Sequence, residues 1–182
     1  RLDACLRKAQ RITERIPMII AAHQRLRNGN EPIAPCPDYG IAFNFLYSLF
    51  GNEPDPEIVR AMDVALILHA DHELNASTFA ARVTAATMAD IYSAMTSAIG
   101  TLKGPLHGGA NEAVIKMLEE IETPEMAREW VLKKLAGKIK IPGFGHRVYR
   151  CEDPRAGVLR HYAEAIGLKN EDTRMLDIAR EV

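Results

Sequence analysis

Three short stretches of the chain place histidine beside glycine or beside other polar side chains. The first, residues 69–73, reads His-Ala-Asp-His-Glu and closes an apolar run. His69 and His72 are three positions apart, so they lie on neighbouring faces of one helical turn. Three interpretations stay open: a ligand-binding site, a metal site that adds Glu73, or histidines stabilised by the dipole at a helix C-terminus. No further His/Cys cluster lies near in sequence, which weakens the metal interpretation.

The second stretch, residues 104–111, reads Gly-Pro-Leu-His-Gly-Gly-Ala-Asn. Glycines around His107 allow a ligand to approach the backbone closely. The positive end of a helix dipole favours a neutral imidazole there, whose N–H can donate to a carbonyl oxygen that becomes an enolate. The pattern therefore indicates chemistry at a carbon beside a carbonyl, or an ordinary Gly-Pro turn with a solvated histidine.

The third stretch, residues 138–155, combines a Gly-x-Gly pair with basic side chains. Gly143 and Gly145 let backbone N–H and C=O groups face a ligand. The basic residues around them are Lys138, Lys140, Arg147 and Arg150. This composition favours a ligand that carries phosphates or carboxylates. Neither a Walker loop nor a dinucleotide fingerprint is present, and a basic surface loop is the alternative.

The elements that must position these stretches are predicted to be helices, because no run alternates between apolar and polar residues as a strand would. Residues 2–26 are rich in helix formers, with Pro17 as a kink or a restart. Capping and proline signals place further helix starts at Asp38, Asp55-Pro56, Ser77, Thr123-Pro124 and Asp153-Pro154.

Other signals mark the ends and breaks of these helices. Gly51 ends the helix that Asp38 caps. The helix that Ser77 caps runs to about Ala98 with a break near Met88, and another helix follows His107. The total is roughly eight helices with short connections. The predicted fold class is all-α.

Composition excludes several classes of protein. The 182 residues are 47% apolar, with 23 Lys plus Arg against 24 Asp plus Glu, so no general attraction to nucleic acid or to an anionic membrane is expected. No run approaches the roughly 18 apolar residues of a membrane span. Cys5, Cys36 and Cys151 are odd in number and far apart, which argues against a disulfide framework or a structural zinc site. We therefore expect a cytoplasmic protein.

Taken together, the three stretches resemble the citrate synthase family. The matching strings, in family order, are residues 69–73, 104–111, 142–149 (Pro-Gly-Phe-Gly-His-Arg-Val-Tyr) and 153–155 (Asp-Pro-Arg). The resemblance covers nearly the whole chain and about the middle half of a family member. The residues of the first and third motifs are similar to those of the prokaryotic type. It implies a citrate-synthase-like multihelical fold in which residues 1–106 are part of the large domain and 107–182 begin the small domain.

The resemblance also assigns roles to individual residues. His107 would hydrogen-bond the thioester carbonyl and stabilise the enol, and His146 would donate to the ketone of oxaloacetate. His72 and Arg155 would hold oxaloacetate, and Asn75 would assist them.

Coenzyme A would be bound by the third stretch. The adenine would lie on the backbone of Ile141, Pro142, Gly143, Phe144 and Gly145. Arg150 would meet the phosphates. No metal is implied and no cofactor, since the coenzyme A thioester is a substrate.

The implied enzyme is an acyltransferase of the citrate (Si)-synthase type, which condenses acetyl-CoA with oxaloacetate and hydrolyses citryl-CoA. The family's base is an aspartate in an Asn-Val-Asp-Phe-Tyr segment, and the chain contains no such string. The chain opens with Arg1 and ends at Val182 without a residue that stops a helix, so we expect a fragment that turns over little or nothing. Family members are homodimers, and residues 88–102 and 107–121 would lie at the interface.

Three alternatives remain. A 2-methylcitrate synthase would use propionyl-CoA, and one added methylene discriminates weakly in an apolar pocket. A citryl-CoA or ATP-citrate lyase module would run the chemistry backwards, but the chain has no nucleotide-grasp region. A non-catalytic helical assembly or binding module could have kept the motifs as relics.

Overall fold

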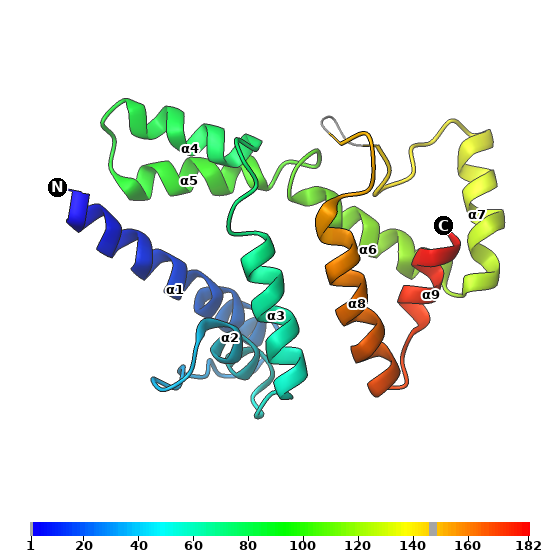
Figure 1. Cartoon of the computed structure of the whole chain (residues 1–182), viewed down its shortest axis with the longest axis horizontal. Coiled ribbons are helices and arrows are strands. Elements are labelled where there is room, and N and C mark those ends of the chain that lie inside the picture. The colour runs from blue at the N-terminus through cyan, green and yellow to red at the C-terminus, as the bar shows by residue number, and fades with distance from the viewer. Residues whose placement is uncertain (1, 146–148) are drawn as a thin grey trace. The chain divides into compact units, whose positions relative to one another are not determined.

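The computed structural model describes residues 2–145 and 149–182, and these residues form helices and no strands. The helices are α1 (Leu2–Arg27), α2 (Ile41–Phe50), α3 (Pro56–Leu68), α4 (Ala76–Ala86), α5 (Ile91–Leu102), α6 (Gly109–Ile121), α7 (Pro124–Ala136), α8 (Pro154–Lys169) and α9 (Arg174–Glu181) (Figure 1). The predicted all-α class is confirmed. None of the described helices is long and apolar enough to cross a membrane.

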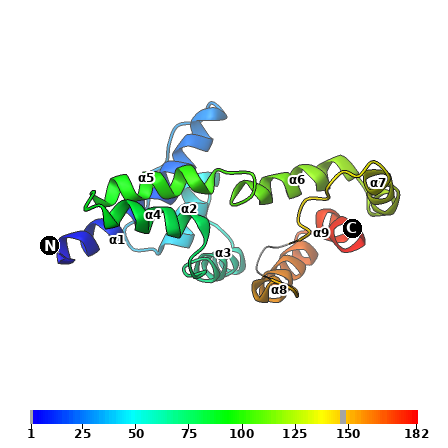
Figure 2. The same ribbon diagram turned by 90° about the horizontal axis from the view of Figure 1, so that it is seen from above.

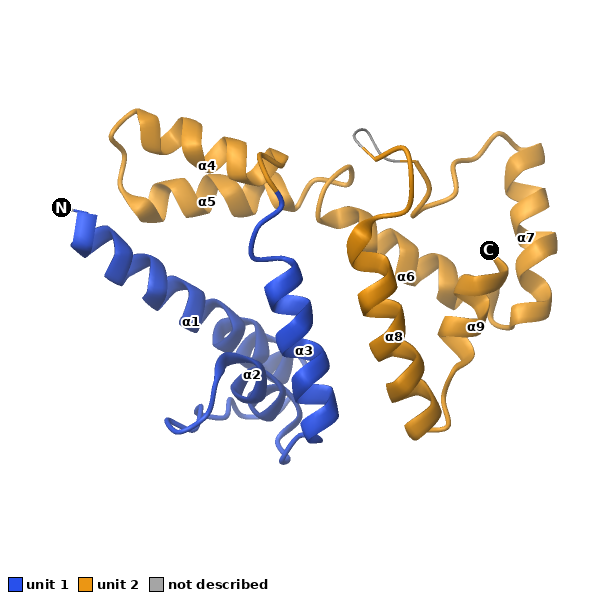
Figure 3. Ribbon diagram, in the orientation of Figure 1, with its two compact units in different colours: residues 1–72 blue, residues 73–182 orange. Residues whose placement is uncertain are grey.

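The chain forms two compact units, residues 1–72 and residues 73–182 (Figure 3). The first unit contains α1 to α3, and α2 packs against both of its neighbours. The second unit contains α4 to α9. The predicted division into domains at residues 106 and 107 stays a prediction.

The first unit begins with one continuous helix, because α1 runs through Pro17 without a restart. Gly51 ends α2 as predicted, at φ 84° with its N–H on the carbonyl of Tyr47. The prediction that Asp38 caps this helix is wrong, since the N-cap is Gly40. The reason is the Asn44 side chain, whose amide bonds the backbone of Cys36 and Tyr39 at 2.7–3.0 Å and holds residues 36–39 as a loop.

The second unit opens with an antiparallel hairpin of α4 and α5, which lie side by side in both views (Figures 1 and 2). The predicted break near Met88 is confirmed, because Met88 adopts a left-handed conformation (φ 68°). The predicted cap Ser77 is wrong. Asn75 is the N-cap of α4, and its Oδ1 accepts the N–H of Thr78 at 3.0 Å.

The remainder of the second unit packs around a small apolar core. Met117, Leu118 and Ile121 of α6 meet Ala127 of α7 and Ile178 of α9. Ile121 and Ile178 are fully buried. The α6 start after His107 and the starts at Thr123-Pro124 and Asp153-Pro154 are confirmed. This core fixes the far end of α6, whose near end carries the His107 loop.

We expect acid to weaken the α4–α5 hairpin through Asp90, the N-cap of α5. Its carboxylate accepts hydrogen bonds from the backbone and hydroxyl of Ser93 and from the backbone of Tyr92, which lowers the pKa of Asp90 below its ordinary 3.8. The charged form therefore stabilises the hairpin above pH 3.8, and this contribution is lost as pH falls through the lowered folded-state pKa. Circular dichroism between pH 7 and pH 2 should show less acid sensitivity in Asp90→Asn, which caps without a charge. Identical acid profiles would contradict this.

Candidate functional site

His107 lies in the turn between α5 and α6 and is held at both its backbone and its ring. Its N–H donates to the carbonyl of Gly104, and its own carbonyl accepts from Ala110, each at 3.0 Å. Its Nε2 lies 2.8 Å from the hydroxyl oxygen of Ser77 and 3.3 Å from the Ser77 backbone nitrogen. The ring is therefore fixed against the first turn of α4, with Nδ1 as the nitrogen that remains for a ligand.

Ser77 is a partner of His107 that the sequence analysis missed, since it predicted a cap there. Ser77 is the second residue of α4, and its hydroxyl also lies 2.8 Å from Oδ1 of Asn75. Asn75, Ser77 and His107 thus form a continuous chain of polar contacts inside the second unit. No local signal points from Ser77 to a partner 30 residues away. The Asn-x-Ser spacing at a helix start could have suggested only the link between Asn75 and Ser77.

The glycines after His107 are required by close approach of the preceding turn. A Cβ on Gly108 would lie 2.7 Å from the carbonyl oxygen of Leu102 and closer still to its side chain. A Cβ on Gly109 would lie 2.9 Å from the carbonyl oxygen of Gly104. Real Cβ atoms do not tolerate such distances to backbone atoms, so only glycine lets the turn close on itself and bring His107 to Ser77.

We expect Gly108→Ala to destabilise the second unit by about 1–3 kcal/mol, the usual cost of overpacking. It should also separate His107 from Ser77. Gly100→Ala is the matched control, because a Cβ there meets nothing within 4 Å and alanine favours the α5 helix. Urea denaturation of the three proteins measures the effect. Equal midpoints for Gly108→Ala and the unmutated chain would contradict it.

Arg155 lies in the first turn of α8, where Asp153 positions its guanidinium. The carboxylate of Asp153 accepts from Nε at 3.0 Å and from Nη2 at 2.7 Å, and it also accepts the Arg155 backbone N–H as the helix N-cap. The hydrogen bonds to Asp153 raise the pKa of Arg155. Nη1 takes no partner among the residues that the structure describes, so this side of a partly buried guanidinium can meet a carboxylate.

His72 follows the end of α3 and is half-buried at the last position of the first unit. His69 caps the end of α3, with Nδ1 2.6 Å from the carbonyl oxygen of Ala65, which agrees with the helix-end interpretation for this histidine. Within residues 2–145 and 149–182, no group of three His, Cys, Asp or Glu side chains is placed to hold a metal ion. The metal interpretation of residues 69–73 therefore gains no geometric support.

The predicted coenzyme A segment follows α7 as an irregular loop. Gly143 and Gly145 both have positive φ, 86° and 80°, so the Gly-x-Gly pair is required by the backbone. Ile141 packs on the core, whereas Phe144 is 64% exposed and Arg150 is exposed. The loop is thus anchored at Ile141 and open to solvent beyond it. His146 and Arg147 lie outside the described residues.

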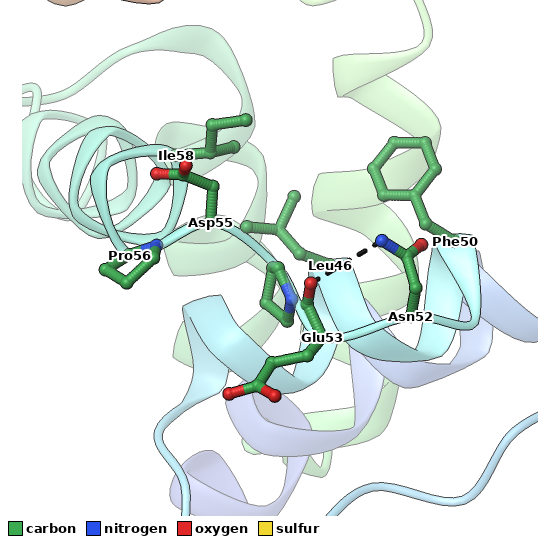
Figure 4. A pocket seen from close by; sticks show the side chains of 8 residues that line it. Leu46, Phe50, Asn52, Glu53, Asp55, Pro56 and Ile58 are labelled. Carbon is green, nitrogen blue, oxygen red and sulfur yellow. Dashed lines mark hydrogen bonds between the residues drawn. The ribbon is translucent and has the colours of Figure 1, made fainter.

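The first unit contains a hollow of its own. It is formed where α2 ends and α3 begins, and its lining is Leu46, Phe50, Asn52, Glu53, Pro54, Asp55, Pro56 and Ile58 (Figure 4). None of the predicted site residues lines it. Its two carboxylates, Glu53 and Asp55, make it unsuited to an anionic substrate. Among the described residues the candidate site thus falls into two groups that no described hydrogen bond or ion pair joins: Asn75, Ser77 and His107 at the starts of α4 and α6, and Asp153 and Arg155 at the start of α8.

Comparison with known proteins identifies the family of the chain. The family model for the citrate synthase C-terminal domain matches residues 2–182. Citrate synthase 2 of Bacillus subtilis is 57% identical over 164 residues, 90% of this chain and 44% of that protein. The 2-methylcitrate synthase of Mycobacterium tuberculosis is 51% identical over 171 residues, 94% of this chain and 44% of that protein.

Solved structures of citrate synthases also resemble this chain. A ternary complex of the Thermoplasma acidophilum citrate synthase with carboxymethyl coenzyme A and oxaloacetate matches with a TM-score of 0.85 and 40% identity, over 92% of this chain and 44% of that one. The Pyrobaculum aerophilum citrate synthase matches with a TM-score of 0.81 and 48% identity, over 91% and 41%. The chain thus spans less than half the length of these relatives. It belongs to the citrate synthase family.

Proposed function

We propose that the protein to which these residues belong condenses acetyl-CoA with oxaloacetate and hydrolyses the product to citrate and coenzyme A. The observation that carries the proposal is the position of the His107 ring. Its Nε2 lies 2.8 Å from the hydroxyl oxygen of Ser77, and its Nδ1 remains for a ligand. Membership of the citrate synthase family supports it.

The reaction requires a base, an enol-stabilising donor and an electrophile. A carboxylate base removes a proton from the acyl methyl group while the His107 ring donates to the thioester oxygen, since enolisation of a weak carbon acid needs both together. The enol carbon then bonds to the ketone carbon of oxaloacetate, whose oxygen takes a proton from His146. Water cleaves the thioester to a carboxylate and the coenzyme A thiol. The base belongs to an Asn-Val-Asp-Phe-Tyr segment that these 182 residues do not contain.

We assign the substrates to different parts of the chain. Arg155, pre-positioned by Asp153, pairs with a carboxylate of oxaloacetate, with His72 and Asn75 as further contacts. The loop from Ile141 to Gly145 receives the adenine of coenzyme A. Exposed Arg150 meets its phosphates.

We further infer a cytoplasmic homodimer. The free thiols Cys5, Cys36 and Cys151 suit a reducing compartment. Residues 88–102 and 107–121 are the proposed interface, and α5 carries exposed Tyr92 and Ile99 together with small residues that permit close helix packing.

Release of coenzyme A thiol on mixing oxaloacetate with acetyl-CoA tests the proposal. The chain is assayed alone and in a chimera in which it replaces the matching segment of the Bacillus subtilis citrate synthase 2. We expect the chimera to release thiol only when both substrates are present, and the 182 residues alone to release little. A folded chimera that releases no coenzyme A thiol with any acyl donor would contradict the proposal.

A 2-methylcitrate synthase is the second candidate, favoured by the 51% identity to the Mycobacterium tuberculosis enzyme of that name. Propionyl-CoA in the same assay distinguishes the two. A higher kcat/KM with propionyl-CoA than with acetyl-CoA would select this alternative.

A further inference from the structure

Val114 of α6 lies against the loop that joins α7 to α8. A Cβ built on Gly143 would lie 3.2 Å from the Cγ2 methyl of Val114, closer than side chains ordinarily pack. Gly143 also has φ 86°, a conformation that residues with a side chain rarely adopt. The backbone of the loop at Gly143 therefore lies directly on the Val114 side chain.

The apolar face of α6 accounts for the position of Val114. Val114, Met117, Leu118 and Ile121 recur at intervals of three and four residues, so they share one face of the helix. The last three belong to the buried core, and Val114 packs against its edge. Val114 precedes Ile121 by seven residues, roughly 10 Å along the helix axis toward His107. The apolar face thus continues beyond the core toward the start of the helix.

The loop follows this face of α6. Its first residues are fixed to the end of α7, where the N–H of Ile139 donates to the carbonyl of Lys134 at 2.9 Å. Ile141 then packs on the core, and Gly143 meets Val114 two residues later. Because Val114 lies nearer to the start of α6 than the core does, the loop runs in that direction.

Beyond Val114 the loop is open. Phe144 is 64% exposed, and a Cβ on Gly145 would meet none of the described atoms within 4 Å. The support from Val114 therefore ends where the exposed part of the loop begins. Any change in the Val114 side chain is transmitted to the backbone of residues 143–145 through Gly143.

We propose that Val114 is a positioning residue for the coenzyme A substrate. The volume of its side chain sets the height of Gly143 above α6, and so the position of the backbone N–H and C=O groups of residues 143–145. This assignment rests on the proposed function, in which the same loop receives the adenine. Since His107 stands in the turn where α6 begins, one helix fixes the spacing between the two parts of the chain that meet the opposite ends of one substrate.

Val114→Ala removes both methyl groups from beneath Gly143. In the chimera we expect the KM for acetyl-CoA to rise by about 3–10-fold, the loss expected when one backbone hydrogen bond to a ligand is weakened or broken. The KM for oxaloacetate and kcat should change little, because Val114 acts only through the loop. Val114→Thr retains the Cγ2 methyl that faces Gly143, so its KM for acetyl-CoA should return to near the unmutated value.

Two variants of α6 separate this role from a general loss of packing. Ile115→Ala makes a similar change on the same helix, at a side chain that is 47% exposed. Ile121→Val removes one methyl group from a fully buried side chain of the same core. Neither should alter the KM for acetyl-CoA, whereas urea denaturation should show a loss of stability in Ile121→Val. An unchanged KM in Val114→Ala, or an equal rise in Ile121→Val, overturns the proposal.

Chymotrypsin cleavage after Phe144 tests the support without any turnover. Exposed loops are preferred sites of proteolysis, and a loop that moves more freely is cut faster. Mass spectrometry of the fragment that ends at Phe144 should show faster cleavage in Val114→Ala than in the unmutated chimera, Val114→Thr or Ile121→Val. An inactive chimera with this cleavage pattern would reject the proposed function and keep Val114 as the support of the loop. Equal rates in Val114→Ala and the unmutated chimera would overturn the support itself.

Discussion

Replacement of His107 with glutamine is expected to lower the kcat for thiol release by about 10²–10³-fold, the usual loss when one donor to a developing oxyanion is removed. The amide nitrogen of glutamine reaches the position of Nε2, so it keeps the contact to Ser77 but leaves nothing at Nδ1. His107→Asn places its amide near Nδ1 and gives up the Ser77 contact. The structure therefore predicts a smaller loss for asparagine than for glutamine.

The pair is measured in the chimera with both substrates saturating, so that kcat reports the chemical steps. Circular dichroism of each variant confirms that the helices have formed. A larger loss for His107→Asn than for His107→Gln would show that Nε2 rather than Nδ1 faces the substrate. That result would contradict the placement of the ring against Ser77.

Replacement of Arg155 with leucine should raise the KM for oxaloacetate by roughly 10–150-fold, because a hydrogen bond to a charged group contributes about 1.5–3 kcal/mol. Arg155→Lys keeps the charge but not the planar guanidinium, so its KM for oxaloacetate should lie between the values of the unmutated protein and Arg155→Leu. Asp153→Asn still caps α8 but holds the guanidinium less firmly. We expect a rise of a few-fold in that variant, roughly the effect of one weakened hydrogen bond.

Arg160→Leu is the control, since Arg160 lies on the same helix and pairs with Glu152 at the surface. Its KM for oxaloacetate should not change. The KM for acetyl-CoA should stay near the unmutated value in all four variants. A rise of that KM equal to the rise for oxaloacetate in Arg155→Leu would show a general loss of structure in place of a lost carboxylate contact.

Most helix starts could be predicted because their signals are local. Asp55-Pro56 and Asp153-Pro154 each combine a capping carboxylate with a proline at the first helical position, and both act as predicted. Gly51 ends α2 in the left-handed conformation that glycine favours. The sequence was also sufficient to predict the break at Met88, although the N-caps of the two helices that flank the break, Asn75 of α4 and Asp90 of α5, were not identified.

The errors arose where a side chain acts at a distance. Asp38 is a good capping residue by type, but Asn44 holds the preceding loop and the helix begins later. Ser77 is equally good by type, but it lies inside the helix and bonds His107, which is 30 residues away. Capping preference describes a residue and its next three neighbours, so it carries no information about such contacts. The motif strings located His107 and Arg155, but their partners Ser77 and Asp153 were identified as a contact set only in three dimensions.

Several connections between helices are strained, so substitutions there can raise the stability of the chain. Five residues other than glycine adopt positive φ in the described part of the chain, and four of them are Met88, Glu122, Lys138 and Glu171, at or next to the ends of α4, α6, α7 and α8. A left-handed conformation costs a side-chain-bearing residue about 1–2 kcal/mol, and glycine escapes that cost. Met88 is exposed, lies between α4 and α5 and is not one of the candidate site residues. Met88→Gly is therefore the natural starting point for a thermostable variant, with a higher melting temperature expected by calorimetry.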